Sequence, residues 1–164
     1  MVRLKKFEDE RGHFARAWCQ EEFKQHGLNP HVAQVNVGFS HRQGTLRGLH
    51  FQVAPHAEAK FVRCTRGAVY DVALDLRKDS ATFGKWFGVE LTADNGQMLY
   101  VPEGFAHGYQ TLQEDTEMYY LTSRPYASAA ATGVRYNDPA FGIKWPLPVS
   151  VISTADQNWP LFRG

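Results

Sequence analysis

Residues 69–76 read VYDVALDL, an octapeptide that alternates apolar and polar positions with a period of two. The apolar residues at positions 70, 72, 74 and 76 share one side of an extended chain, whereas Asp71 and Asp75 fall on the opposite side. Further short runs of strand-forming residues lie at positions 32–39, 45–51, 60–65, 85–91, 98–101, 108–112 and 117–122. Many short strands at regular spacing predict an all-β sandwich or barrel.

Turn-forming residues separate these predicted strands. They are Arg66-Gly67, Asp94-Asn95-Gly96, Pro102-Glu103-Gly104 and Gln113-Glu114-Asp115. One short helix is predicted at residues 19–26, where Gly27 would end it. No linker or internal repeat divides the chain, so we expect residues 1–164 to form a single domain. The tail after Tyr136 is expected to pack over the barrel as irregular chain.

The composition argues against several classes of partner. Lys and Arg (18) nearly balance Asp and Glu (17), and no basic run could neutralise a phosphate backbone, so nucleic acid is not an expected partner. The apolar stretches are too short for a transmembrane helix, so no membrane association is expected.

Residues 1–10 are charged and lack a signal-peptide core, and Cys19 and Cys64 have no metal-like or redox-like spacing. These features favour a cytoplasmic protein with two reduced thiols.

Two motifs carry residues that suit proton transfer. The first is RGLHFQ at residues 47–52, which contains His50 and is followed by Lys60. The second is PEGFAHG at residues 102–108, which contains His107. A histidine titrates near neutral pH, and a lysine on the inner face of a barrel is costly unless it meets a negative charge. Together these residues suit removal of a proton next to a carbonyl, with the lysine stabilising the enolate.

The chain resembles the dTDP-4-dehydrorhamnose 3,5-epimerase family of the cupin superfamily over essentially its whole length. The matching segments follow the family's order: DERG (9–12), QVN (34–36), RGLHFQ (47–52), AK (59–60), YDV (70–72), DLR (75–77), FGKW (83–86), PEGFAHG (102–108), NDP (137–139), WP (145–146) and SxxD (153–156). The resemblance implies a cupin-type jelly-roll barrel, usually a homodimer. It also implies inversion of C3 and C5 of a nucleoside-diphosphate 4-keto-6-deoxy sugar without an organic cofactor or metal.

The resemblance and the chemistry agree on the catalytic residues. His50 is the candidate base, although a barrel histidine taken alone is more often an ordinary interior residue. The resemblance supplies Asp156 as the carboxylate that fixes its tautomer, a residue that the sequence alone does not select among the acidic side chains. Lys60 is the candidate cation for the enolate, and the alternative is a surface lysine at the start of a strand.

The general acid is expected to be a tyrosine in the run at residues 117–122. Adjacent strand residues point to opposite faces, so only one of Tyr119 and Tyr120 can enter the barrel. The resemblance, counted back from Tyr126, favours Tyr120 for this catalytic position, and a register error of one residue would exchange the two. Tyr126 itself resembles a position that contacts the sugar and affects which carbons are inverted. Its alternative is an aromatic residue packed on the rim.

Arg47 is expected to hold the diphosphate, because a guanidinium can bind phosphate oxygens in a bidentate manner. On a regular strand, Arg47 and His50 would face opposite sides. Their presence in one pocket requires a bulge, and Gly48 is the residue that permits it.

Four more residues are candidates for substrate binding. Gln34 and Asn36 share one face of their strand, where they could either bond the ligand or face solvent. The resemblance adds Phe14, and it adds Arg11 as a phosphate contact that reaches a neighbouring subunit's site. If Arg11 acts in this way, dimer formation contributes directly to substrate binding.

His107 stands where metal-dependent cupins place a ligand. Such cupins also use two histidines and a carboxylate from the first motif, but here His50 is followed by Gln52, and His56 lies beyond Pro55. We therefore expect no metal, and we interpret His107 as a substrate-binding residue that orients the substrate or supports the base. A metal-dependent cupin and a non-catalytic sugar-nucleotide binding module are the alternatives from other classes. A C3-only epimerase, or one that uses another nucleotide, is the alternative within the same chemistry.

Two residues depart from the family pattern. Arg16 stands where the family usually has a glutamate near the nucleotide, so the base preference could differ. Glu58 replaces the usual glutamine before Ala59 and places a negative charge close to Lys60. That carboxylate could form an ion pair with the lysine or could simply lie in a loop.

Overall fold

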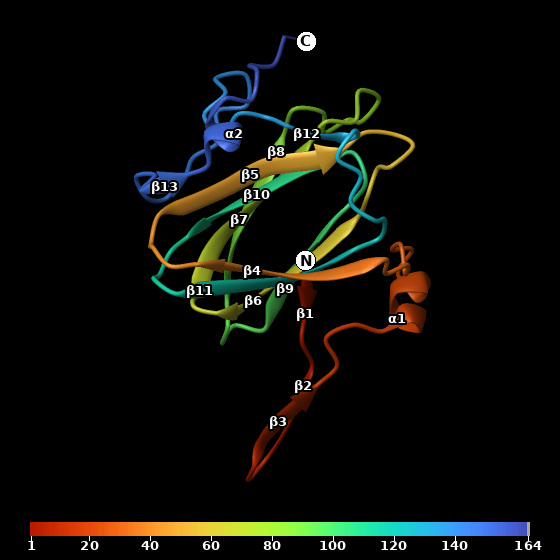
Figure 1. Ribbon diagram of the computed structural model, residues 1–164. Helices are drawn as coiled ribbons and strands as arrows, with labels where there is room; N and C mark the ends of the chain where they lie inside the picture. The colour runs from red at the N-terminus through yellow and green to blue at the C-terminus, as the bar shows by residue number, and fades with distance from the viewer. Residues whose placement is uncertain (164) are drawn as a thin grey trace.

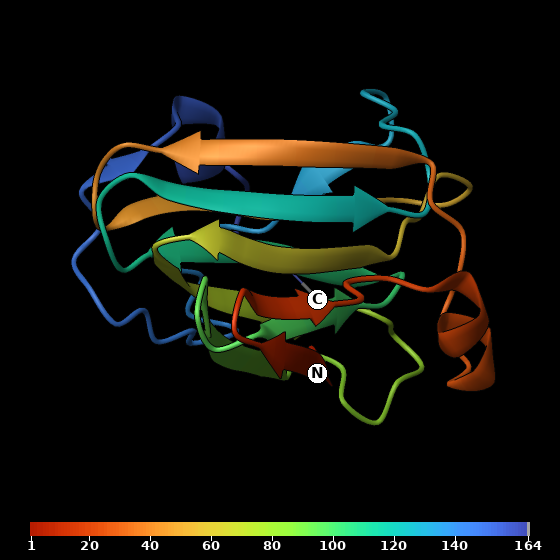
Figure 2. The same cartoon turned by 90° about the horizontal axis from the view of Figure 1, so that it is seen from below.

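The computed structural model describes residues 1–163 and consists mainly of two facing β-sheets (Figure 1). The five-stranded sheet contains β1 (Val2–Arg3), β9 (Gln97–Val101), β6 (Lys60–Arg66), β11 (Thr116–Thr122) and β4 (Gln34–Ser40), in that spatial order. Figure 2 shows this sheet from below, with β4 at one edge, followed by β11 and β6. The six-stranded sheet contains β12 (Ala131–Gly133), β5 (Thr45–Gln52), β10 (Phe105–Thr111), β7 (Ala68–Asp75), β8 (Trp86–Thr92) and β13 (Val151–Ile152).

This arrangement confirms the predicted all-β class. Each strand expected from alternation is present, with its ends shifted by a few residues at most. Strand β13 pairs in parallel with β5, and the remaining strand pairs are antiparallel. In the part of the chain that the structure describes, the two sheets face each other without joining into a closed ring of strands. The barrel is therefore open along its sides.

A short helix and a hairpin lie outside the two sheets. Helix α1 (Gln20–Gln25) confirms the predicted helix, and Gly27 after it has a φ of 68°. Strands β2 (Lys6–Asp9) and β3 (Gly12–Ala15) form a hairpin that projects away from the sheets (Figure 1). The hairpin was not predicted, because almost all of its residues are exposed and its strands lack an apolar alternation.

Strand β7 is buried on both faces, which explains its composition. Val72 and Leu74 pack with Phe141 from the C-terminal tail, whereas Val69 packs against the opposite sheet. Asp71 shares the inner face with Val69 and is fully buried. The predicted alternation is therefore present, but the tail covers its apolar side and the barrel interior holds its acidic side.

The bulge predicted at Gly48 is present between β5 and β10. His107 lies opposite His50 and Tyr109 lies opposite Arg47, so β5 has one extra residue between the two pairs. Gly48 has a φ of 118°, and a Cβ there would lie 2.5 Å from the backbone of β10. Glycine is required at this close approach. The bulge turns Arg47 and His50 to the same inner face.

The tail after Tyr136 packs over the six-stranded sheet as predicted, and it contains a second helix, α2 (Thr154–Gln157). The indole of Trp145 donates to the Tyr136 carbonyl at 2.9 Å. Ser153 caps α2, its hydroxyl accepting from the Asp156 amide at 3.0 Å. Strand β13, which directly precedes α2, pairs with β5, so Asp156 lies beside that strand.

Within residues 1–163, neither helix is long and apolar enough to cross a membrane. Cys19 and Cys64 are free thiols. Burial raises the pKa of the Cys64 thiol to about 11.

Candidate active site

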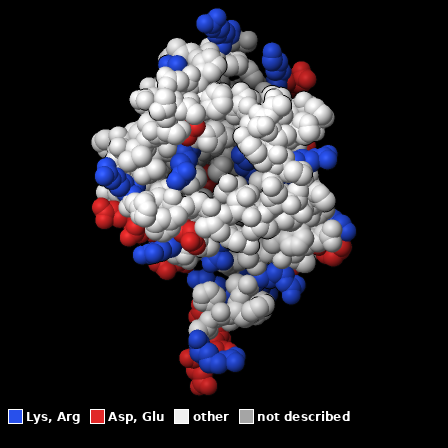
Figure 3. All heavy atoms as spheres, in the orientation of Figure 1, with Lys and Arg blue, Asp and Glu red and all other residues white. Residues whose placement is uncertain are grey.

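The two sheets enclose a cavity with two lobes, and Figure 3 shows a hollow in the centre of the body with basic side chains at its rim. The first lobe, here called the Gln34 lobe, has a volume of about 730 Å³. The second, here called the His107 lobe, has a volume of about 560 Å³. Four residues line both lobes: His50, Lys60, Tyr120 and Asp156. The structure therefore brings together all of the residues proposed for catalysis.

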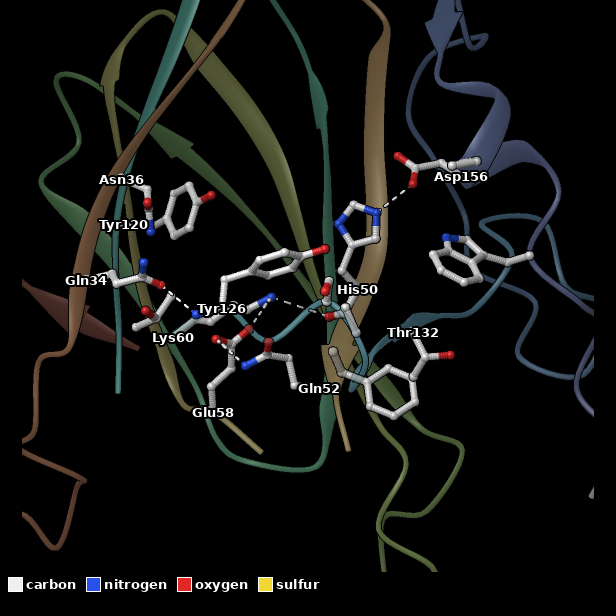
Figure 4. Close-up of a pocket in the computed structure, with 16 residues that line it drawn as sticks. Gln34, Asn36, His50, Gln52, Glu58, Lys60, Tyr120, Tyr126, Thr132 and Asp156 are labelled. Carbon is white, nitrogen blue, oxygen red and sulfur yellow. Dashed lines mark hydrogen bonds and ion pairs between the residues drawn. The ribbon is translucent and has the colours of Figure 1, made fainter. Parts of the chain in front are cut away.

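His50 and Asp156 form a close pair at the junction of the lobes (Figure 4). The Nε2 atom of His50 lies 2.6 Å from Oδ1 of Asp156, and the Gly48 amide donates to Oδ2 at 3.1 Å. Burial alone would raise the pKa of Asp156, but the His50 and Gly48 hydrogen bonds outweigh it and hold that pKa below its ordinary value. The carboxylate is thus ionised and orients the imidazole ring through this hydrogen bond.

Lys60 lies on the inner face at the start of β6, where its side chain is only 12% exposed. Its Nζ is 3.3 Å from Oε1 of Glu58 and 3.5 Å from the carbonyl oxygen of His50. The lysine is therefore a cavity residue with an ion-pair partner, which excludes the surface-lysine alternative.

The register of β11 separates the two adjacent tyrosines. Tyr120 lines both lobes of the cavity, whereas Tyr119 lies on the outer face and is 37% exposed. Burial, with a contribution from the negative charge of Glu58, raises the pKa of Tyr120. The phenol consequently stays protonated at neutral pH, as a general acid must.

The predicted binding residues occupy both lobes. Arg47 lines the His107 lobe, and its guanidinium donates to the Phe39 carbonyl at 2.9 Å. Gln34 and Asn36 line the Gln34 lobe together with Tyr126. The Tyr126 amide donates to Oε1 of Gln34 at 2.7 Å, so Gln34 also anchors the loop that carries this tyrosine.

His107 pairs with a different carboxylate from His50. Its Nε2 lies 2.5 Å from Oδ1 of Asp71, and both side chains are almost fully buried. Tyr109 lines the same lobe, and burial raises its pKa to about 12. Among the described residues, no group of three or more His, Cys, Asp or Glu side chains lies close enough to hold a metal ion.

Arg11 and Phe14 do not reach the cavity of their own chain. Arg11 lies at the tip of the hairpin, where it donates to Asp9 and its side chain is 84% exposed. Phe14 on β3 is 66% exposed. The hairpin therefore carries both residues away from the site (Figure 1).

Several cavity residues were not assigned to the site by sequence reasoning, among them Gln52, Glu58 and Trp159. Gln52 follows His50 by two residues and so faces the same side of β5, a signal that the sequence did contain. Glu58 was noted only as a departure from the family. Trp159 had no sequence signal; its ring centroid lies 6.4 Å from that of His50, with the two ring planes at 72°.

The sequence model of the dTDP-4-dehydrorhamnose 3,5-epimerase family matches residues 1–164. The chain belongs to this family. A dTDP-4-dehydrorhamnose 3,5-epimerase from Sinorhizobium fredii is 44% identical over 161 residues, which are 98% of this chain and 83% of the relative. The protein is therefore an epimerase, an enzyme of the isomerase class.

Two solved structures extend the comparison. The dTDP-4-dehydrorhamnose 3,5-epimerase from Bacillus anthracis, with TDP and PPi bound, is 40% identical with a TM-score of 0.94, covering 98% of this chain and 91% of that one. A 3′-monoepimerase from Streptomyces bikiniensis, in complex with dTDP-quinovose, is 36% identical with a TM-score of 0.89, covering 98% and 81%. The family fold thus occurs in both a 3,5-epimerase and a monoepimerase.

The two residues expected to depart from the family pattern lie in different environments. Arg16 is exposed just after β3, outside both lobes of the cavity. Glu58 lies inside the Gln34 lobe, with a side chain that is only 8% exposed. The second departure is therefore the one placed to affect the epimerase reaction within this chain.

Proposed function

We propose that the protein inverts C3 and C5 of dTDP-4-keto-6-deoxyglucose without a metal or an organic cofactor. One observation carries this proposal: His50 enters the cavity from the six-stranded sheet, whereas Tyr120 enters from the five-stranded sheet (Figure 4). A sugar ring between them meets a base on one face and an acid on the other. A site that only binds the sugar nucleotide does not need this acid–base pair.

The reaction begins when the ring nitrogen of His50 that is not bonded to Asp156 takes the proton from C3 or C5. The electron pair of the broken C–H bond forms the C=C bond of an enolate, and the negative charge develops on the C4 oxygen next to the Lys60 ammonium. Tyr120 then donates its phenolic proton to the same carbon from the opposite face, which inverts it. His50 releases its proton to solvent, and Tyr120 regains one.

The remaining cavity residues hold the substrate. Arg47 binds the diphosphate through its guanidinium, and His107 orients the sugar nucleotide from the same lobe. Gln34 and Asn36 offer amide groups that hydrogen-bond the ligand in the other lobe. Tyr126 contacts the sugar at the edge of that lobe, where its side chain is 67% exposed.

We further propose a homodimer in which Arg11 and Phe14 of one chain reach the cavity of the other. Phe7 lies opposite Phe14 in the hairpin, and these aromatic side chains are 56% and 66% exposed. Val35 and Val37 on the outer face of β4 are also exposed. Apolar side chains gathered in this way are typical of a surface that another chain covers.

We also propose that the enzyme works in the cytoplasm. Both cysteines are free thiols. Free thiols persist in the reducing cytoplasm, whereas oxidising compartments favour disulfides.

The direct test is incubation with dTDP-4-keto-6-deoxyglucose in heavy water, with deuterium counted at C3 and C5 by mass spectrometry and NMR. Label at both carbons is the expected result. Label at C3 alone would establish a monoepimerase instead. No label at either carbon, with circular dichroism showing a folded protein, would contradict the proposal and favour another nucleotide or a binding module.

A further inference from the structure

Glu58 places a buried carboxylate inside the proposed catalytic cavity. Glu58 precedes Lys60 by two residues, so the two side chains lie on the same inward side of the chain. Oε1 of Glu58 lies 3.3 Å from Nζ of Lys60, and the two side chains are only 8% and 12% exposed. A buried ammonium without a partner is costly, and the Glu58 carboxylate offsets part of that cost by pairing with Lys60.

The other oxygen of Glu58 is held by Gln52. Nε2 of Gln52 donates to Oε2 of Glu58 at 3.1 Å, and its Oε1 accepts from the Ala127 amide at 2.6 Å. Nε2 of Gln52 also lies 3.2 Å from the carbonyl oxygen of Pro125. Because Pro125 and Ala127 flank Tyr126, these hydrogen bonds connect the Tyr126 loop to Glu58 and, through Glu58, to Lys60.

The contacts of Lys60 leave one N–H donor of its ammonium group free to bond a ligand. An ammonium has three N–H donors. One faces Glu58 at 3.3 Å and another faces the His50 carbonyl oxygen at 3.5 Å, which leaves a third for the cavity. A donor fixed in direction before the substrate arrives stabilises a developing oxyanion better than one that must reorganise.

We propose that Glu58 is a positioning residue that holds the Lys60 ammonium in place and directs it at the C4 oxygen of the sugar. This inference rests on the proposed epimerase function. It adds that the carboxylate which departs from the family pattern acts through Lys60 and does not itself touch the reacting atoms. The negative charge also helps to keep Tyr120 protonated, since Glu58 contributes to the raised pKa of that phenol after burial.

Other ionisable side chains line the cavity around Lys60, and none of them should be mutated in a test of Glu58. They line the same two lobes from β5, β10, β11, α2 and the Tyr126 loop: Arg47, His50, His107, Tyr109, Tyr120, Tyr126 and Asp156. Glu58→Gln is the suitable substitution, because it removes the charge while keeping the shape and a carbonyl that can accept from Gln52.

The experiment compares Glu58→Gln with wild type in steady-state kinetics and in binding of dTDP by calorimetry. We expect kcat to fall by about tenfold to a hundredfold, as for a misplaced catalytic group, while the dissociation constant of dTDP changes by less than about twofold. Glu58→Asp, which keeps the charge on a shorter side chain, should restore part of kcat. Glu117→Gln is the matched control, since Glu117 is a half-buried glutamate on β11 that bonds Thr65 outside both lobes.

A second readout needs no substrate. With ¹³C-labelled lysine, NMR relaxation should show larger-amplitude motion of the Lys60 side chain in Glu58→Gln than in wild type, because the ion-pair partner is lost. This change supports the inference even if wild type labels no sugar carbon, an outcome that would overturn only the proposed function. If Glu58→Gln does not fold, Glu58→Asp carries both measurements and should show the same changes in a weaker form.

Two results would overturn the inference. Unchanged kcat together with unchanged motion of the Lys60 side chain would mean that Glu58 does not hold the lysine in place. A loss of dTDP binding as large as the loss of kcat would make Glu58 a ligand contact instead of a positioning residue.

Discussion

Two histidine–aspartate pairs, whose histidines lie side by side in the six-stranded sheet, differ in their access to the cavity. His50 on β5 and His107 on β10 are directly opposite each other in the ladder. The His50 side chain is 45% exposed and that of its partner Asp156 is 8% exposed, whereas the values for His107 and Asp71 are 9% and 0%. The two hydrogen bonds are therefore almost alike, but their surroundings differ. His50–Asp156 is here called the open pair, and His107–Asp71 is called the closed pair.

The two pairs differ in exposure because their carboxylates come from different elements of the fold. Asp71 belongs to β7, the strand next to β10, and its Oδ2 is buried without a hydrogen-bond partner among the described residues. Asp156 comes from the tail helix α2 and also accepts from the Gly48 amide. The open pair can exchange a proton with a ligand or with solvent, so it suits a base. The closed pair fixes a side chain and stabilises the sheet.

The largest expected effect is the loss of turnover in His50→Gln. Removal of a general base should lower kcat by roughly 10²- to 10⁴-fold, with little change in the melting temperature because the side chain is half exposed. His107→Gln should instead raise KM more than it lowers kcat. Steady-state kinetics of both variants show which histidine is the general base. A larger loss of kcat in His107→Gln would reverse the roles of the two pairs.

The next effect is on stability, and it should fall on the closed pair. Asp71→Asn weakens a fully buried hydrogen bond to His107 and should lower the free energy of unfolding by about 1–3 kcal/mol. Asp156→Asn should cost less, about 1 kcal/mol, because His50 reaches solvent. Urea unfolding measures both values. Equal losses would show that the two pairs contribute alike to the fold.

The smallest effect is the pH dependence of the open pair. The pKa of Asp156 in the folded protein lies below its ordinary value of 3.8, so its ionised pairing stabilises the fold above that pH. This contribution should disappear as the pH falls through the lowered folded value. The difference in unfolding free energy between wild type and Asp156→Asn should accordingly be present at pH 7 and shrink in acid. A difference that grows in acid would contradict this sign.

The sequence predicted the strands and the catalytic face of the fold because both depend on local patterns. Alternation located β7, and Gly48 indicated the bulge that turns Arg47 and His50 to one side. The hairpin β2–β3 was missed, since exposed strands carry no apolar signal. The burial of Asp71 was not predicted either, because it depends on His107, which lies 36 residues further along the chain.

The site was predictable where a motif or its spacing defined it. His50 and Lys60 follow from strand motifs, whereas the choice of Tyr120 over Tyr119 required the family resemblance. Asp156 also required the resemblance, since it lies 106 residues from its partner His50. Trp159 lies in irregular chain, where no periodicity relates a residue to the sheet.

The most direct test of the account compares exchange and inversion in two variants incubated with dTDP-4-keto-6-deoxyglucose in heavy water. Tyr120→Phe keeps the base but loses the acid, so it should incorporate deuterium with little inversion. His50→Gln should show neither exchange nor inversion, and Tyr119→Phe, on the outer face, serves as the matched control. Exchange in His50→Gln at the wild-type rate would contradict the assignment of the open pair as the base.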